Sequence, residues 1–135
     1  WHLRFEPRCR EGRWLAEHAY AKAMIDVSDG LVVDVGRLAK ASALDVQLDT
    51  AAIRRRTAHT SLSQALTGGE DYELLFNIKP DDKARLQAVV DIVHIGEITE
   101  EAEGVSLHTK GGHTHDITAI GWDALLKAEE KGKQQ

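Results

Sequence analysis

The sequence predicts an α+β domain in which helices cover a mixed or largely antiparallel sheet. Three features of the chain support this: helical and strand patterns alternate through its first part, apolar and polar residues alternate in several short runs, and a hairpin signal lies near its end. The 135 residues are enough for one domain with a core of its own. Hydrophobic residues make up 42% and charged residues 29%, as in ordinary globular proteins.

The first part of the chain alternates between helix and strand. Residues 10–22 are predicted to form a helix, and the short apolar run 23–25 is predicted to form a buried strand that ends in Asp26. A second helix is predicted to follow a turn at residues 28–30. Its core-facing positions recur at helical spacing: Leu31, Val35, Leu38 and Ser42.

The middle of the chain predicts two more strands. Alternating residues over 44–48 predict a strand with one buried face and one wet face. Residues 51–63 are polar, basic and aperiodic, so they are predicted to form a loop or a short helix. The pair Gly68-Gly69 then breaks the chain, and alternation over 72–78 predicts the next strand.

The last part is predicted to contain a helix, a strand and a hairpin. Pro80, followed by carboxylates in the first turn, predicts a helix over residues 80–90. Residues 92–98 predict a strand. A glycine pair predicts a hairpin, and the remaining elements follow in order: strands over 105–109 and 115–118, then a short helix near Asp123.

Charge and composition exclude several classes of protein. The formal net charge of −5 argues against a general nucleic-acid binder, which needs a basic surface, and the basic run Arg54-Arg55-Arg56 is expected to be a solvated loop. No apolar run reaches the roughly 18 residues that a membrane span needs. Cys9 is the only cysteine, so no internal disulfide can form, which suits a reducing cytoplasm.

The segment Asp26-Val27-Ser28-Asp29-Gly30 concentrates polar groups between a strand and a helix start. Carboxylates at a turn are hard oxygen ligands of the kind that Mg²⁺ prefers, and Ser28 with the first helical N–H groups could meet phosphate oxygens. An ordinary helix cap explains the same residues, and by spacing alone it is the more frequent case.

A second polar segment, Gly68-Gly69-Glu70-Asp71-Tyr72, precedes an apolar strand. Glu70 or Asp71 could hydrogen-bond a polar or cationic substrate, and a glycine turn with solvated acids is an equally good interpretation. Trp122 could stack on a flat heteroaromatic ring, although an isolated tryptophan is more often a core or rim residue. The pair His113 and His115 has no third ligand at metal-binding spacing, so we interpret it as part of a wet hairpin.

In this order the segments resemble the thiamine-monophosphate kinase family. The segments that carry the resemblance are Pro7-Arg8, residues 23–31, Ala41-Ser42, residues 68–74, His94-Ile95-Gly96 and Gly121-Trp122. The Asp-x-Ser-Asp-Gly part is shared with a wider superfamily that includes aminoimidazole ribonucleotide synthetase. The Gly-Gly-Glu-Asp-Tyr-Glu-Leu part is the one that distinguishes the kinase from its relatives.

The resemblance covers the chain from about Pro7 to Leu125 and matches only the C-terminal domain of the kinase. It implies a three-layer α/β/α sandwich, partly ferredoxin-like, over residues 1–128, with an N-terminal ATP- and Mg²⁺-binding domain that this chain lacks. Residues 129–135 are expected to form a disordered tail. The resemblance also implies a cytoplasmic enzyme whose full-length form is a homodimer.

The resemblance implies a kinase that uses ATP, with several Mg²⁺ ions, to convert thiamine monophosphate into thiamine diphosphate by direct in-line transfer. Asp26 and Asp29 match its Mg²⁺ ligands, and Ser28 matches its ATP contact. Glu70 and Trp122 match substrate contacts, and no side chain is expected to act as a catalytic base. The chain alone is expected to be inactive, because the other domain would supply most of the metal ligands.

Two alternatives remain open at this point. One is another ATP-dependent enzyme of the same superfamily, such as a purine-pathway synthetase. The other is a non-catalytic domain that binds thiamine phosphate. The phosphate acceptor separates the first alternative from the kinase, and transfer in the presence of Mg²⁺ separates the second.

Overall fold

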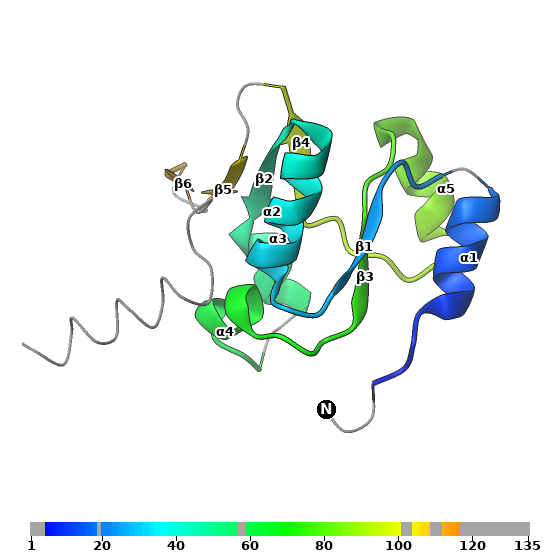
Figure 1. Cartoon of the computed structure of the whole chain (residues 1–135), viewed down its shortest axis with the longest axis horizontal. Coiled ribbons are helices and arrows are strands. Elements are labelled where there is room, and N and C mark those ends of the chain that lie inside the picture. Colours follow the sequence, from blue (N-terminus) through cyan, green and yellow to red (C-terminus); the bar gives the residue numbers. More distant parts are fainter. Residues whose placement is uncertain (1–4, 19, 57–58, 101–103, 109–111, 117–135) are drawn as a thin grey trace, which may run out of the picture.

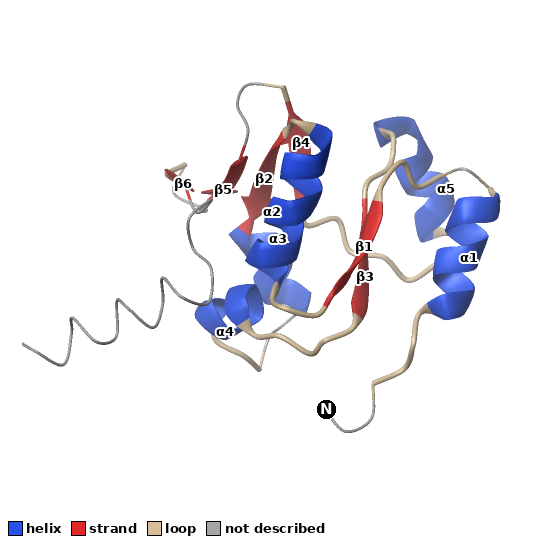
Figure 2. Ribbon diagram, in the orientation of Figure 1, coloured by secondary structure: helices blue, strands red, loops and turns tan. Residues whose placement is uncertain are grey.

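The computed structural model describes residues 5–18, 20–56, 59–100, 104–108 and 112–116. In this part of the chain, helices surround two separate sheets (Figures 1 and 2). Trp122, the predicted helix near Asp123 and the predicted tail over residues 129–135 lie outside the described residues. No helix within the described ranges is long and apolar enough to cross a membrane.

Helices and strands alternate through most of the described chain. The helices are α1 (Cys9–Glu17), α2 (Leu31–Ser42), α3 (Thr50–Arg56), α4 (Leu62–Thr67) and α5 (Lys83–Gln87), with the 3₁₀ turn η1 (Pro80–Asp82) directly before α5. The strands are β1 (Met24–Val27), β2 (Asp45–Asp49), β3 (Glu73–Phe76), β4 (Gly96–Thr99), β5 (Gly104–His108) and β6 (Thr114–Asp116).

The strands form an antiparallel pair, β1–β3, and a four-stranded sheet in the order β4-β2-β5-β6. In the larger sheet β2 and β5 run parallel, whereas the outer pairs are antiparallel. The α+β class with mixed and antiparallel sheets is therefore confirmed, although the strands described divide into two sheets rather than one. The three-layer, partly ferredoxin-like arrangement stays a prediction.

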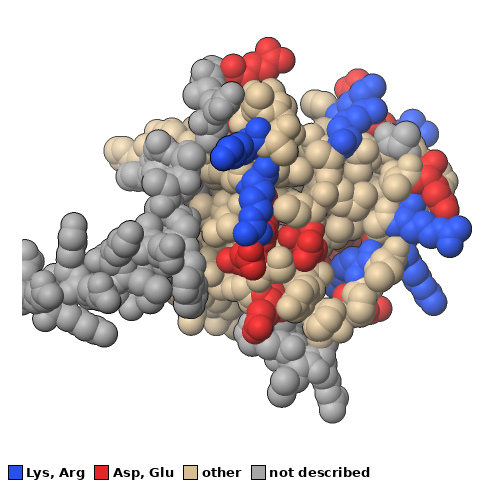
Figure 3. Space-filling model, in the orientation of Figure 1, with Lys and Arg blue, Asp and Glu red and all other residues tan. Residues whose placement is uncertain are grey.

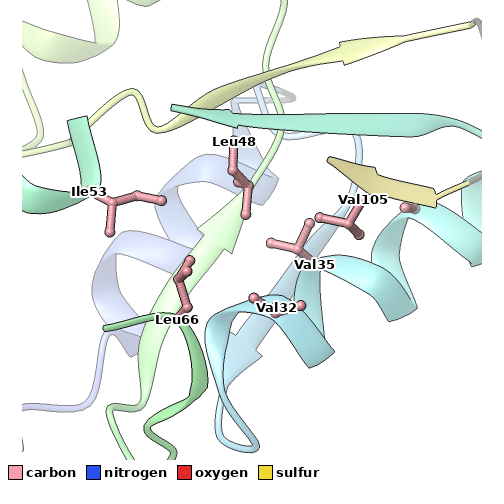
Figure 4. Packing of buried hydrophobic residues seen from close by; sticks show 7 residues of the cluster. Val32, Val35, Leu48, Ile53, Leu66 and Val105 are labelled. Carbon is pink, nitrogen blue, oxygen red and sulfur yellow. The ribbon is translucent and has the colours of Figure 1, made fainter. Parts of the chain in front are cut away.

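Helix α2 joins the two sheets, since it contacts β1 of the pair and both β2 and β5 of the larger sheet. The predicted helix is confirmed, but its buried stripe is rotated from the predicted one: Leu31 and Leu38 are half-buried and Ser42 is exposed. The buried apolar residues form one cluster, most of it shown in Figure 4: Val32, Val35, Ala39, Leu48, Ile53, Leu66 and Val105.

Strand β2 does not have the clean alternation that the sequence predicted. Asp45 and Leu48 are buried, while Val46 and Gln47 are both half-buried. The reason is its central position, with β4 on one side and β5 on the other. The predicted hairpin is confirmed, because β5 and β6 pair antiparallel with Leu107 opposite His115.

Helix α1 ends at Glu17 rather than near residue 22. The backbone groups that a longer helix would use are bound elsewhere: the Lys22 N–H donates to the Asn77 carbonyl oxygen at 3.2 Å, and the Ala23 N–H donates to the Asn77 side-chain oxygen at 2.7 Å. Asn77 thus draws residues 22–23 toward the end of β3. The helix predicted over 80–90 is likewise shorter, since η1 and α5 together end at Gln87.

The strand predicted over residues 92–98 is wrong for its first half, because β4 begins only at Gly96. Gly96 lies opposite Leu48, and one residue beyond this register Asp49 ends β2. The chain then turns into α3, so the contact ends with one further backbone bond, in which the Asp49 N–H donates to the Ile95 carbonyl oxygen at 2.8 Å. The short apolar run 23–25 is also not fully buried, since β1 is half-buried and extends through the exposed Asp26 to Val27.

The segment predicted as a loop or short helix forms α3, followed by a second short helix, α4. The Asp49 carboxylate caps α3 by accepting the Ala51 N–H at 2.7 Å. A capping box opens α4, where the Ser61 hydroxyl accepts the Gln64 N–H and the Gln64 side chain accepts the Ser61 N–H. Helix α4 carries the chain to Gly68 and so sets where the next segment begins.

Candidate functional site

The turn between β1 and α2 is shaped by Gly30. This residue caps α2 with φ 115°, a conformation that side-chain-bearing residues rarely adopt. Its carbonyl oxygen accepts the Asp34 N–H at 3.0 Å, which starts the helix. A Cβ on Gly30 would lie 3.0 Å from the Thr67 carbonyl oxygen, so α4 approaches the turn closely at this point.

The carboxylate of Asp34, which is fully buried, anchors the same turn. Its Oδ2 accepts the backbone N–H groups of Ser28 at 2.9 Å and Asp29 at 3.0 Å. These bonds satisfy two donors that would otherwise lack partners ahead of the helix. The sequence reasoning missed Asp34, although a carboxylate next to a core-facing position of an amphipathic helix was an available signal.

Arg37 links the buried anchor to the exposed turn. Its Nη1 donates to Asp34 Oδ1 at 2.8 Å, and its Nη2 lies 2.6 Å from Asp29 Oδ2. The hydrogen bond to Asp29, helped by both negative charges, raises the pKa of the Arg37 guanidinium above its usual value. The guanidinium is therefore a fixed positive charge beside Asp29. A metal ion bound to the Asp29 carboxylate would share that carboxylate with Arg37 or displace Arg37 from it.

The Gly-Gly-Glu-Asp segment lies directly against this turn. The Glu70 N–H donates to the Ser28 carbonyl oxygen, and the Tyr72 N–H donates to the Val27 carbonyl oxygen, both at 2.8 Å. Gly69 allows this approach, because a Cβ there would lie only 2.6 Å from the Ser28 oxygen. The fold thus brings together the two polar segments that the sequence singled out separately.

The structure places four of the five predicted site residues on these adjacent segments. Asp29 and Glu70 are exposed in their turns, and Ser28 is half-buried between them. Asp26 is exposed on β1, opposite Leu74 of β3. The fifth predicted residue, Trp122, lies outside the described residues, so its predicted role stays a prediction.

The carboxylates of Asp26 and Asp29 fit a magnesium site that phosphates and water complete better than one formed by protein side chains alone. Within the ranges that the structure describes, no three His, Cys, Asp or Glu residues gather as a metal-binding group. Mg²⁺ is usually held by one or two protein carboxylates, with phosphates and water completing its shell. The exposed carboxylates of Asp26 and Asp29 match that smaller requirement.

Two cavities lie next to strand β3. One of about 340 Å³ and one of about 590 Å³ are both bordered by β3 and by residues 94–96, and both are lined mainly by apolar side chains. Neither is lined by Asp26, Ser28, Asp29 or Glu70, although Val27 and Asp71, which adjoin these residues in the chain, line the smaller one. On the face in Figure 3 acidic and basic groups adjoin each other without a continuous field of one sign.

Sequence comparisons connect this chain to a known family. Residues 2–108 match the family described as AIR synthase related protein, C-terminal domain. The thiamine-monophosphate kinase of Escherichia coli (strain K12) is 34% identical over 116 residues, which cover 77% of this chain and 35% of that protein. The thiamine-monophosphate kinase of Salmonella typhimurium is 35% identical over 122 residues, covering 82% and 37% respectively.

Solved structures give the same result. A crystal structure of thiamine-monophosphate kinase from Stenotrophomonas maltophilia K279a has a TM-score of 0.66 at 30% identity, covering 81% of this chain and 37% of that chain. A structure described as AaThiL complexed with AMPPCP and TMP has a TM-score of 0.63 at 27% identity, covering 85% and 37%. The predicted resemblance is confirmed, and the chain spans about a third of the length of the curated relatives it matches.

Proposed function

The chain belongs to the family of AIR synthase-related C-terminal domains, and on this premise we propose that it is part of a kinase that transfers a phosphoryl group from ATP to thiamine monophosphate. The product would be thiamine diphosphate. One observation carries the proposal: a backbone hydrogen bond holds the turn of Ser28 against Glu70, so the residues proposed to contact the nucleotide and the substrate lie next to each other.

The relatives supply the substrates of this proposal. Curated proteins that match the chain are named thiamine-monophosphate kinases, and one structural neighbour is described as complexed with AMPPCP and TMP. We infer the same pair of substrates, ATP and thiamine monophosphate, for the protein to which this chain belongs. A cytoplasmic location and a homodimeric full-length form stay predictions that rest on the family resemblance alone.

Asp26 and Asp29 are proposed to hold Mg²⁺ at the edge of this surface. When bound, Mg²⁺ would neutralise charge on the clustered phosphates. The protein's own part is to present two carboxylates in a fixed relation, and the Asp34 carboxylate does this by holding the N–H groups of Ser28 and Asp29. Arg37 Nη2 lies 2.6 Å from Asp29 Oδ2 and so helps to fix the position of that carboxylate.

Ser28, Glu70 and Trp122 are proposed to position the two substrates. Ser28 lies in the turn before α2, where its hydroxyl can hydrogen-bond a nucleotide phosphate. Glu70 is exposed and acidic, and so suits the cationic, hydrogen-bonding ring system of thiamine. Trp122 is proposed to stack on that ring system.

The reaction proposed is direct in-line transfer without a phosphoenzyme. A phosphate oxygen of thiamine monophosphate attacks the γ-phosphorus of ATP, the new P–O bond forms, and the bond to the β-phosphate oxygen breaks with ADP leaving. The attacking oxygen is already anionic, so no side chain has to remove a proton. Catalysis would therefore depend on positioning and on charge neutralisation.

The proposal is tested by assaying thiamine diphosphate formation from ATP, Mg²⁺ and thiamine monophosphate. A version extended to the length of the relatives should turn over, and the 135-residue chain alone should not. Measurable turnover by the chain alone would contradict its predicted dependence on another domain. If the extended protein is folded and binds ATP but makes no thiamine diphosphate, a different phosphate acceptor or a binding-only role replaces this proposal.

A further inference from the structure

A two-pronged ion pair joins the segment before α1 to the start of β3. Arg8 Nε donates to Glu73 Oε2 at 3.1 Å, and Arg8 Nη2 donates to Glu73 Oε1 at 3.2 Å, across 65 residues of sequence. This fork geometry fixes direction as well as distance. The bond to Glu73 raises the pKa of the Arg8 guanidinium, and the charges of Glu11 and Glu6 add to the effect.

A ring contact lies beside this ion pair. The rings of Phe5 and Tyr72 have centroids 4.5 Å apart and are tilted by 34°. Tyr72 directly precedes Glu73, so residues 5–8 touch two consecutive residues of the other segment through an aromatic pair and a charged pair. Both rings are partly exposed, Phe5 by 40% and Tyr72 by 36%.

The segment that these contacts reach has an unusual backbone. Glu70 has φ 66° and Tyr72 has φ 52°, both in the left-handed region that side-chain-bearing residues rarely occupy. Such a conformation is strained for a residue with a side chain and persists only where its surroundings hold it. The two backbone bonds to Ser28 and Val27 hold the segment from one side.

Helix α1 also has apolar anchoring of its own. Leu15 on that helix is fully buried, and a Cβ added at Gly12 would lie 3.5 Å from Leu74 and 3.7 Å from the Met24 sulfur, so the helix runs close to the β1–β3 pair. The ion pair between Arg8 and Glu73 is therefore an addition to apolar packing at this helix.

We propose that Phe5 and Arg8 form a clamp that fixes the conformation of residues 70–72, with Arg8 as a positioning residue for Glu70. Phe5 and Arg8 contact Tyr72 and Glu73 on one side. Backbone hydrogen bonds to Ser28 and Val27 hold Glu70 and Tyr72 on the other side. The inference rests on the proposed function only insofar as Glu70 is the substrate contact. The physical clamp is a property of this chain and is tested on it.

The first test uses the 135-residue chain with an Arg8→Met substitution. The amide hydrogen exchange of Glu70 and Tyr72 is measured by NMR relative to that of Val35 in α2, together with the couplings that report φ at Glu70 and Tyr72. We expect exchange at these two amides to become about tenfold faster, because a charge-assisted two-pronged bond is lost. No change relative to Val35 would overturn the clamp.

Arg13→Met is the matched control, since Arg13 bonds Glu17 at 2.6 Å on the exposed side of the same helix. It should leave Glu70 and Tyr72 unchanged, and an equal response to it would overturn the clamp. Arg8→Lys keeps the charge but loses the fork, and it serves as the test if Arg8→Met does not fold. It should give a smaller effect in the same direction, and an unchanged Arg8→Lys protein would overturn the clamp.

The second test uses the extended protein. Arg8→Met should raise the KM for thiamine monophosphate several-fold and leave the KM for ATP unchanged. The double variant Arg8→Glu with Glu73→Arg exchanges the two charges, and its KM for thiamine monophosphate should lie between those of the parent and Arg8→Met. Turnover with an unchanged KM and unchanged exchange would overturn the clamp. Faster exchange at Glu70 and Tyr72 in a protein that never makes thiamine diphosphate would support the clamp and refute the proposed function.

Discussion

The two sheets in the described part of the chain are held in place by different kinds of interaction. Around the four-stranded sheet the core contacts are apolar: Val35 of α2, Leu48 of β2 and Val105 of β5 are each exposed by 2% or less. In the β1–β3 pair only Val27 is buried, and the neighbouring turns are held by backbone bonds, a buried carboxylate and ion pairs.

The four-stranded sheet with its core is the scaffold, and the turns beside the β1–β3 pair form the candidate site. Apolar packing depends on shape and tolerates apolar side chains of similar volume, whereas the turns near Ser28 and Glu70 depend on specific atoms. Substitutions in the two regions should therefore behave differently, and the following predictions run from the largest expected effect to the smallest.

The largest effect is expected from Leu48→Ala in the apolar core. Leu48 is 1% exposed, so its truncation leaves a cavity and should lower the free energy of unfolding by about 2–5 kcal/mol. Urea denaturation measures this. Ile98→Ala on the neighbouring β4 is the control, because Ile98 is 40% exposed and should cost much less. Equal losses at the two positions would contradict the placement of the core.

The next effect is expected from Asp34→Asn. The buried carboxylate accepts two turn N–H groups and the Arg37 guanidinium, and an amide would direct its own N–H₂ toward one of these donors. We expect a loss of about 2–3 kcal/mol in unfolding free energy. Arg37→Ala, which removes only an exposed partner of the carboxylate, should lower the unfolding free energy clearly less. The anchor role is wrong if the two variants unfold alike.

Two glycines should respond in opposite directions to alanine. In Gly69→Ala the new Cβ would lie 2.6 Å from the Ser28 oxygen, so the two site segments must separate, at a cost of about 1–3 kcal/mol. In Gly36→Ala the Cβ meets only Val105 at 3.8 Å, and better helix propensity should add up to about 1 kcal/mol. Thermal unfolding compares them, and a Gly69→Ala protein at least as stable as the parent would contradict the close approach at Gly69.

The smallest effect is expected from Ser61→Ala, which removes the capping box of α4. Loss of the hydroxyl that accepts the Gln64 N–H should lower stability by about 1 kcal/mol. Ser63→Ala in the same helix keeps the cap and should change little. Urea denaturation of both variants checks this, and equal stability of the two would show that the capping box is not needed for α4.

Local pattern predicted the elements whose partners are close in sequence. The helix from Leu31 to Ser42 and the hairpin of β5 and β6 followed from apolar spacing and a glycine turn. The capping box Ser61-x-x-Gln64 was also readable as a helix start, although it was not used to predict α4.

Elements that depend on distant partners were predicted less well. Nothing in residues 92–95 shows that β2 ends at Asp49, so that the regular pairing with β4 starts only at Gly96. Nothing in residues 18–22 shows that Asn77 binds the backbone of Lys22 and Ala23. In both cases a tertiary contact overrides a pattern that is correct locally.

For the candidate site, too, the sequence predicted local features but not the contacts between distant segments. Residue types and order singled out Asp26, Ser28, Asp29 and Glu70, but they could not show that the two segments touch. The supporting roles of Asp34, Arg37 and Arg8 were not predicted for the same reason, because each acts through a partner in another part of the fold or in the next turn.

We propose that the two adjacent segments act in one reaction: the segment of Asp26, Ser28 and Asp29 on the metal and the nucleotide, and the segment of Glu70 on thiamine monophosphate. The most direct test is steady-state kinetics of the extended protein with Asp26→Asn and Glu70→Gln. We predict that Asp26→Asn lowers kcat and raises the Mg²⁺ concentration required, while Glu70→Gln mainly raises the KM for thiamine monophosphate. If both variants keep the parent kinetics for ATP, Mg²⁺ and thiamine monophosphate, the adjacent turns are structural and the account is contradicted.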